Sequence, residues 1–375
     1  MNNEQQTANG FTLIELMVAI GLLAIVLSFA GVIFNAGINT HRTALANAEI
    51  MRKLRAITDQ LDSDFQGLCK DAPLMIFFRQ EPRSDPNRYD QIMFFADGDF
   101  QSTQPYDGDP LVPALTGMPI RGNVARIYYG QAYSLDRSDG TMKYPFYLEK
   151  EDRVLARRQH ILSADPNLAL WPNPADVNGT FGAIDLVSGR YGNDVNEHDS
   201  LSLAQWQVLD TGVYDVAGGN ILDICFDFLP YMDVRDARTI HKLMCEGLGS
   251  FAVQWAYYDP DYGRFHWFPS DDPDGTGAYS HFDLAKVDIP PASPKVLPGY
   301  PPGFEVFGAF FNIPGSFKIN YWAIPSLMRY NPNPSIPRRF PSGFYPSALK
   351  FTFTLFDSKG VIKQGRTFTH IVYLD

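Results

Sequence analysis

The sequence predicts an α+β protein in which a long N-terminal helix precedes a β-rich globular domain. Two observations favour this fold class. No proline occurs before Pro73, and apolar residues recur at helical spacing over the preceding segment. The rest of the chain alternates short apolar or aromatic runs with turns, and it holds all 28 prolines and most of the 30 glycines. With 375 residues, 45% hydrophobic and 14% aromatic, the chain is large enough to bury a substantial core.

The first part of the helix is apolar enough to span a membrane. Between Phe11 and Phe34 the one charged residue is Glu15. At about 1.5 Å per residue, this stretch crosses the roughly 30 Å hydrocarbon core of a bilayer. A cleaved secretory signal is the competing interpretation. The length of the apolar run, the missing basic n-region and the missing A-x-A site argue against it.

Glu15 requires a physical explanation, because an acidic side chain inside a membrane helix costs about 3 kcal/mol and ordinarily has a partner. Glu15 lies near the start of the span. Reaching the membrane interface, or being protonated, would therefore also reduce this cost.

The helix is predicted to continue to about Leu68, as an amphipathic extension over residues 35–70. The apolar residues of this extension form the stripe that we expect to face the domain: Ile38, Leu45, Met51, Leu54, Ile57, Leu61, Phe65 and Leu68. The charged residues are expected on a solvated face: Arg52, Lys53, Arg55, Asp59, Asp62 and Asp64. The globular domain then covers residues 71–375.

Eight runs after Pro73 are predicted to be strands. They are Leu74–Phe78, Gln91–Phe95, Val124–Tyr129, Val154–Ile161, Ile221–Leu229, Phe251–Tyr258, Leu349–Phe356 and Thr367–Leu374. The run Leu349–Phe356 alternates apolar and polar residues with a period of two, which indicates a strand that covers a core with one face.

Three segments are predicted to be large insertions in the domain: 97–119, 164–207 and 288–346. The last contains 13 of the 28 prolines, interleaved with aromatic residues. This composition favours an extended but packed excursion over a flexible linker. A binding face is the alternative interpretation of the aromatic residues.

Charge and motifs exclude several classes of function. The formal net charge is −11, which disfavours nucleic acid as a partner. The sequence has no G-x-S-x-G elbow, no H-E-x-x-H, no phosphate-binding glycine loop and no dinucleotide fingerprint, so we predict neither catalysis nor a cofactor. His241, His266 and His281 lack metal-ligand spacing. The acidic loop Asp271–Asp274 lacks the spaced acid that closes a calcium loop, so we predict a solvated turn there and no metal site.

The three cysteines are Cys69, Cys225 and Cys245, too few for a disulfide framework. In the alternating run Leu222–Phe228, Cys225 falls on the face opposite the apolar residues. An exposed thiol in an oxidising compartment tends to find a partner, and Cys245 is close in sequence. We therefore predict a disulfide between Cys225 and Cys245, with Cys69 free.

The run Gly-Phe-Thr-Leu-Ile-Glu from Gly10 to Glu15 resembles the junction of type IV prepilins, where a short polar leader ends in glycine before an apolar helix. The resemblance implies that residues 1–10 are a leader, that a prepilin peptidase cuts after Gly10, and that the new amine of Phe11 is methylated. It also implies that the Glu15 carboxylate pairs with the N-terminal amine of a neighbouring subunit. The implied domain is an antiparallel, pilin-like β structure.

The sequence departs from the family pattern in three ways. The leader has no Lys or Arg, although such leaders are usually basic. Four basic residues follow the span, namely Arg42, Arg52, Lys53 and Arg55, and a positive-inside count would place them in the cytoplasm. The span also lacks the helix-breaking proline common in major pilins. The resemblance still implies a single-pass bacterial inner-membrane protein with a periplasmic domain.

Three further segments resemble the J-type minor pseudopilins of type II secretion and the related PilW-type minor pilins: Val154–Arg158, Gly247–Phe251 and Pro346–Leu349. The resemblance implies assembly near the tip of a pseudopilus. The implied partners are other minor and major pseudopilins or pilins, the prepilin peptidase and the inner-membrane assembly platform. Two alternatives stay open. One is a minor pilin of a type IV pilus, and the other is a membrane-tethered periplasmic binding protein or enzyme.

Overall fold

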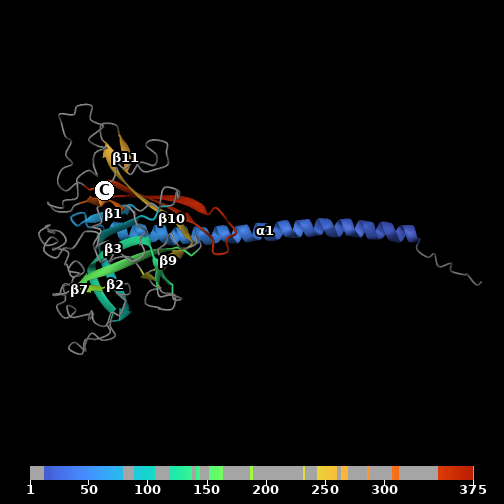
Figure 1. The fold of residues 1–375 in the computed structure, drawn as a ribbon, viewed down its shortest axis with the longest axis horizontal. Helices are drawn as coiled ribbons and strands as arrows, with labels where there is room; N and C mark the ends of the chain where they lie inside the picture. The colour runs from blue at the N-terminus through green and yellow to red at the C-terminus, as the bar shows by residue number, and fades with distance from the viewer. Residues whose placement is uncertain are drawn as a thin grey trace, which may run out of the picture.

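The computed structural model describes one long helix and three β-sheets (Figure 1). The described residues are 12–78, 88–105, 119–136, 141–143, 152–163, 186–188, 231–232, 243–259, 263–268, 285–287, 306–311 and 345–374. The α+β class predicted from the sequence is confirmed.

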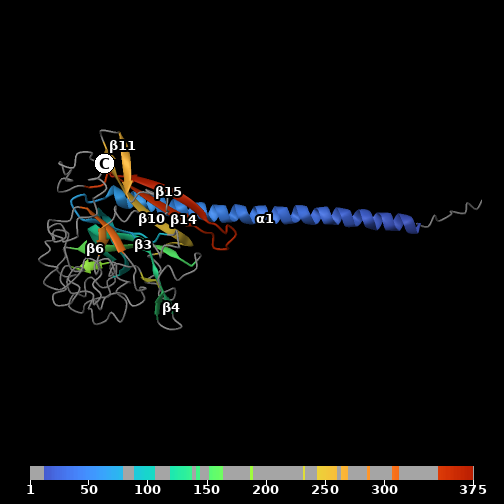
Figure 2. The ribbon, with the colours of Figure 1, turned by 45° about the horizontal axis from the view of Figure 1, so that its top comes forward.

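The helix α1 (Leu13–Gln66) has 54 residues and is therefore about 80 Å long. Its first half stands clear of the sheets and its second half lies among them (Figures 1 and 2). The helix ends at Gly67, whose carbonyl accepts a hydrogen bond from the backbone N–H of Asp97 at 2.6 Å. A Cβ atom at position 67 would lie 1.9 Å from the Asp97 carbonyl oxygen, so this close crossing requires glycine.

The largest sheet has eight strands, in the order β12-β13-β1-β2-β3-β6-β7, with β9 also paired to β6. Most of its pairs are antiparallel, and β6 with β7 is parallel. The strands are β1 (Leu74–Phe78), β2 (Gln91–Pro105), β3 (Pro119–Gln131), β6 (Val154–Ser163), β7 (Leu186–Ser188), β9 (Leu243–Glu246), β12 (Ala285–Val287) and β13 (Val306–Phe311).

The second sheet has four antiparallel strands in the order β11-β10-β14-β15. These are β10 (Leu248–Asp259), β11 (Arg264–Phe268), β14 (Ala348–Leu355) and β15 (Arg366–Tyr373). A third, small sheet joins β4 (Tyr133–Asp136), β5 (Thr141–Lys143) and β8 (Tyr231–Met232).

The core lies where the second half of α1 meets the two larger sheets. Phe65 stacks on Phe94 of β2 with ring centroids 4.2 Å apart, and it contacts Phe351 of β14 at 5.7 Å. One aromatic side chain of the helix therefore touches both sheets. Leu61 and Ile57 extend this contact along the helix and are fully buried.

The buried stripe of α1 differs in part from the predicted one. Leu45 and Met51 are 54% and 51% exposed, whereas Ala46 and Ile50 are buried. Positions 46, 50, 57 and 61 are spaced by four and seven residues and form one seam, while Leu45 and Met51 each lie about 100° away from it. Apolar character alone therefore predicted burial wrongly for Leu45 and Met51.

Seven of the eight predicted strands coincide with strands of the structure, and the eighth, Ile221–Leu229, lies outside the described residues. The structure adds a strand where the sequence predicted a proline-rich excursion: β13 pairs antiparallel with all five residues of β1. Phe311 at its end is buried against Trp255, with ring centroids 5.1 Å apart. This part of the excursion is packed into the core.

Asp64 was expected on a solvated face, and this expectation is wrong. Its side chain is 5% exposed and binds Arg157 of β6 through two hydrogen bonds, at 2.6 and 2.7 Å. The hydroxyl of Tyr129 on β3 also donates to Asp64. Burial would lower the pKa of Arg157, but Asp64 outweighs it and raises that pKa above its ordinary value. The helix is thus tied to the larger sheet by a buried ion pair.

Replacing Asp64 with alanine is expected to destabilise the fold by about 3–5 kcal/mol, because Arg157 would keep its charge in a largely buried position with Gln159 but no carboxylate as a partner. Asp62, which is half exposed and bonded to His370, provides the control, and Asp62→Ala is expected to cost less than about 1 kcal/mol. Denaturant unfolding of the detergent-extracted chain measures both. Equal destabilisation by the two variants would show that the Asp64–Arg157 pair contributes no more to the free energy of unfolding than the exposed Asp62–His370 contact.

Candidate functional site: the N-terminal helix and its junction with the domain

The first half of α1 presents apolar side chains on every side. All fifteen large apolar residues from Leu13 to Phe34 are more than half exposed. The helix is long and apolar enough to cross a membrane, and the protein buries none of its most apolar stretch. In water this surface would be strongly unfavourable, so the geometry fits a helix whose solvent here is lipid.

Glu15 and Thr12 form a reciprocal cap at the start of α1. The backbone N–H and the hydroxyl of Thr12 both donate to Oε2 of Glu15 at 2.9 Å, and the Thr12 hydroxyl accepts from the backbone N–H of Glu15 at 3.3 Å. Such a capping box satisfies donors that the helix itself leaves unpaired. The second carboxylate oxygen, Oε1, has no hydrogen-bond partner among the described residues.

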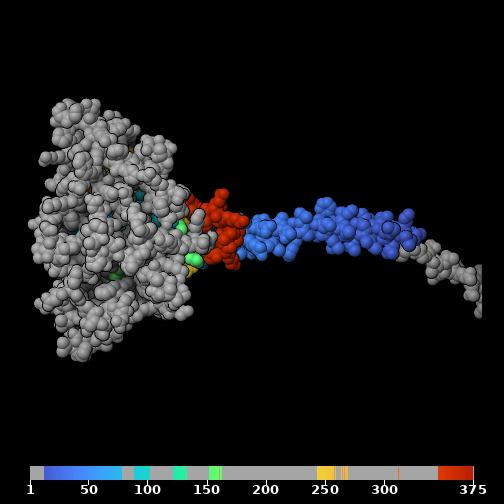
Figure 3. All heavy atoms as spheres, viewed as in Figure 1, coloured from blue at the N-terminus to red at the C-terminus, as the bar shows by residue number. Residues whose placement is uncertain are grey.

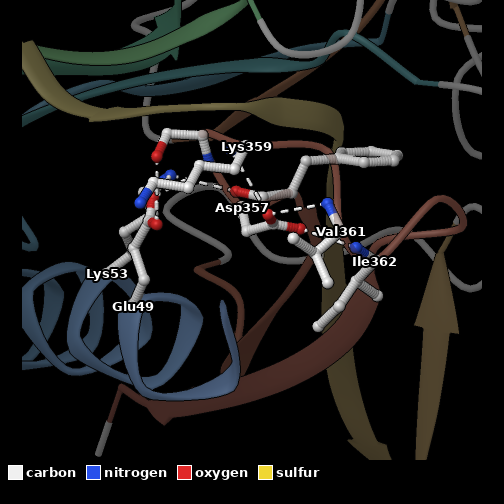
Figure 4. Close-up of polar contacts among 8 residues, drawn as sticks. Glu49, Lys53, Asp357, Lys359, Val361 and Ile362 are labelled. Atoms are coloured by element: carbon white, nitrogen blue, oxygen red, sulfur yellow. Dashed lines mark hydrogen bonds and ion pairs between the residues drawn. The ribbon is translucent and has the colours of Figure 1, made fainter. Parts of the chain in front are cut away.

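A polar junction holds α1 against the turn between β14 and β15 (Figure 4). The Lys53 ammonium donates to the carbonyl of Phe356 at 2.9 Å and lies 2.9 Å from the Glu49 carboxylate. Glu49 in turn accepts from the backbone N–H and the hydroxyl of Ser358 at 3.0 and 3.1 Å. Lys53 was expected on a solvated face, but its side chain is 14% exposed.

The turn itself is organised by the buried carboxylate of Asp357. It accepts backbone hydrogen bonds from Ile362 at 2.8 Å, Val361 at 2.9 Å and Lys359 at 3.3 Å. Burial alone would raise the pKa of Asp357, but these N–H donors outweigh it and hold the pKa below its ordinary value. Hydrogen bonds from Lys53 and Ser358 likewise outweigh burial and lower the pKa of Glu49.

The junction lies at the end of the domain from which the exposed half of α1 emerges (Figure 3). In Figure 3 the segment around this turn, drawn in red, is the part of the domain that extends furthest along the exposed helix. Glu49 and Lys53 thus hold the helix to the domain near the point where it emerges, beside the buried residues Ala46 and Ile50. Charge patterning alone did not find this junction, because its partners are about 300 residues apart in the sequence.

Several predicted site residues lie outside the described residues. Gly10 and Phe11 are among them, so the cleavage junction stays a prediction. Cys225 also lies outside the described residues. Cys245 is buried with a free thiol, and burial raises its pKa to about 12. Cys69 is also buried and free. Because Cys225 lies outside the described residues, the Cys225–Cys245 disulfide stays a prediction.

The possible metal ligands give no further site. The acidic loop Asp271–Asp274 lies outside the described residues, as do His241 and His281. Among the residues that the structure does describe, no group of three His, Cys, Asp or Glu side chains is placed to hold a metal ion.

Comparison with known proteins bears on the start of the chain. A family model described as the prokaryotic N-terminal methylation motif matches residues 6–31, which include Gly10, Phe11 and Glu15. The chain is a type IV pilin-like protein. The match covers residues 6–10 of the predicted leader, the predicted cut and most of the exposed span, whereas the domain lies beyond it. No curated protein and no solved structure matches this pilin-like chain.

The junction is expected to loosen in acid. Because the pKa values of Glu49 and Asp357 are lowered by folding, their contacts stabilise the junction above the ordinary carboxyl pKa near 4 and are lost as pH falls through the lower folded values. Hydrogen exchange at Val361 and Ile362 should therefore accelerate below about pH 4, after correction for intrinsic rates. Asp357→Asn should show fast exchange at neutral pH as well. Protection that is independent of pH would contradict this assignment.

Proposed function

We propose that this chain is a minor pseudopilin of a type II secretion system, which assembles through α1 into the pseudopilus near its tip. The observation that carries the proposal is the combination of a prepilin-type N-terminus with a helix whose first half is apolar and uncovered. Before assembly, such a helix would anchor the protein in lipid. After assembly, its apolar surface would pack against the helices of other subunits. The protein acts by assembly, without catalysis.

The three segments that resemble J-type pseudopilins support the finer assignment because each contributes to a contact that holds α1, or the turn beside it, in place. Arg157, in the first segment, binds Asp64 of the helix. Gly247, which opens the second, has a positive φ of 76° and accepts a hydrogen bond from the Phe356 N–H at 2.8 Å. The third segment begins β14, which leads to Phe356 and the turn. Far apart in sequence, these residues share the task of seating the helix.

The Glu15 carboxylate is the candidate contact between subunits. Its Oε2 is used by the cap, while Oε1 stays available for a cation. Cleavage after Gly10 would leave Thr12 and Glu15 in place, so the cap survives processing, and it would create a positive amine at Phe11. In lipid, pairing of that amine with Glu15 of a neighbour would neutralise both charges and fix the register of the helices.

The proposed cut depends on a small residue at position 10. Gly10→Val is expected to leave the leader attached, because a bulky side chain at the cut would obstruct the peptidase. Ala8→Val, two residues earlier, serves as the control and should still be processed. Intact masses of both variants and of the parent, extracted from membranes that contain the peptidase, decide the outcome. Identical N-termini in Gly10→Val and the parent would reject the prepilin assignment.

Changing Glu15 to leucine should leave membrane insertion intact and weaken assembly. A hydrogen bond to a charged group is worth about 1.5–3 kcal/mol, so recovery of partner subunits should fall about tenfold or more. The experiment co-expresses the processed variant with its cognate pilin-like subunits and measures co-purification and secretion. Recovery of secretion-system subunits supports the finer proposal, and recovery of a pilus major pilin would reassign the chain to a pilus.

Two further variants separate charge from capping. Glu15→Gln keeps an oxygen that can accept from Thr12 but removes the charge, so it should assemble as poorly as Glu15→Leu. Thr12→Ala removes the cap hydroxyl and keeps the charge, so it should assemble nearly normally. Normal partner recovery by processed Glu15→Leu would exclude the pairing mechanism.

A further inference from the structure

Among the described strands, β15 forms one open edge of the four-stranded sheet. It is the last strand in the order β11-β10-β14-β15, and its eight residues pair with β14 in continuous register without a bulge. Within the described part of the chain, no strand pairs with its other edge. Natural proteins usually protect such an edge with proline, a bulge or a covering element, and β15 contains neither of the first two.

Two hydrogen bonds fix which backbone groups face outward. The Leu374 N–H donates to the Ser347 carbonyl on the β14 side, so alternate residues before it, Val372 to Arg366, also point toward β14. The Phe356 N–H donates away from β15, to Gly247, which gives the same alternation from the β14 side. The N–H and C=O groups that face away from β14, and that pair with no other strand among the described residues, therefore belong to Thr367, Thr369, Ile371 and Tyr373. Together they offer four donor–acceptor pairs over about 20 Å.

The side chains of the same four residues are exposed on the outer face of the sheet. Tyr373 is 59% exposed and Ile371 is 37% exposed. The ring of Tyr373 lies 5.9 Å from Phe265 of β11, which in turn contacts Tyr258, itself 44% exposed. A strand laid along β15 would find backbone partners at the edge and apolar side chains beside it.

The direction of β15 argues against antiparallel pairing with the β15 strand of a second copy. Ser358, just before β15, contacts Glu49, and His370 within it contacts Asp62, so the strand runs along α1 in the same direction (Figure 2). Antiparallel pairing of two β15 strands would point their helices in opposite directions. Two copies anchored in one membrane, with both domains on the same side, do not allow this.

We propose that β15 is a docking edge for an extended segment of a different pilin-like subunit, which adds a strand to the four-stranded sheet. The inference rests on the proposed function, because the occupant must itself be held beside α1. The backbone supplies the pairing, and the exposed face formed by Thr369, Ile371 and Tyr373 supplies side-chain selectivity.

The test uses the full chain in membranes, co-expressed with the cognate pilin-like subunits, with a photoreactive phenylalanine analogue in place of Tyr373. Thr369→Pro removes one outward N–H and no internal hydrogen bond, which an edge strand tolerates. Thr369→Ala is the matched control, because it keeps that N–H. We expect a cross-link to a pilin-like subunit that persists with Thr369→Ala and falls at least tenfold with Thr369→Pro.

A second variant tests whether loss of the cross-link could come from misfolding. Ile371→Lys keeps every backbone group and introduces an exposed charge of the kind that protects natural edges. It should also reduce the cross-link, at an unchanged melting temperature. Equal cross-linking with Thr369→Pro and Thr369→Ala would overturn strand addition, and so would a cross-link confined to lipid or to a second copy.

The result also separates this inference from the proposed function. If Glu15→Leu abolishes partner recovery while the β15 variants leave it unchanged, the docking edge is wrong and the assembly function stands. If neither change affects partner recovery, both proposals fail.

Discussion

The structure depends on one helix whose two halves need different environments. The first half of α1 exposes apolar side chains that only lipid or other helices would accommodate, and the second half buries Ile57, Leu61 and Phe65 between two sheets. In proteins, most of the stability of a helix comes from the packing of its apolar face and less from intrinsic helix propensity. Removing either environment would therefore affect the whole protein.

Polar contacts orient the helix where packing alone would leave its rotation undetermined. Asp64 and Arg157 form a buried pair at one end of the seam, and Glu49 and Lys53 meet the turn after β14 at the other. An apolar seam tolerates small rotations, whereas a buried ion pair does not, because misalignment leaves a charge without a partner. The direction in which Glu15 points from the start of the helix is thus set by contacts some 50 to 70 Å away.

The sequence predicted the start of the molecule better than its centre. The span and its single charge follow from local composition, and the strand Leu74–Phe78 was predicted to the residue. By contrast, the burial of Asp64 depends on Arg157, 93 positions later, and a charge pattern on one helix carries no sign of that partner. The choice of Ala46 and Ile50 over Leu45 and Met51 has the same origin, since the sheets decide which side of the helix is covered.

In the candidate site, too, local features could be predicted from the sequence and tertiary contacts could not. Thr12 and Glu15 lie three residues apart, and their cap follows from spacing that a sequence reveals. The turn organised by Asp357 and the open edge of β15 depend on tertiary pairing and became visible through the structure. The strand β13 was hidden by proline-rich flanks, because strand signals weaken next to proline even where five or six residues pair fully.

The central claim, that one continuous helix joins the membrane span to the core, can be tested by a distance. Spin labels at Asn35 and Asp59, both exposed, lie 24 residues apart on α1, and the continuous helix predicts a backbone separation of about 36 Å. Pulsed electron paramagnetic resonance on the lipid-reconstituted protein should give a narrow distribution centred near this value. A broad distribution, or a mean shorter by 10 Å or roughly two helical turns, would show that the helix breaks between lipid and domain.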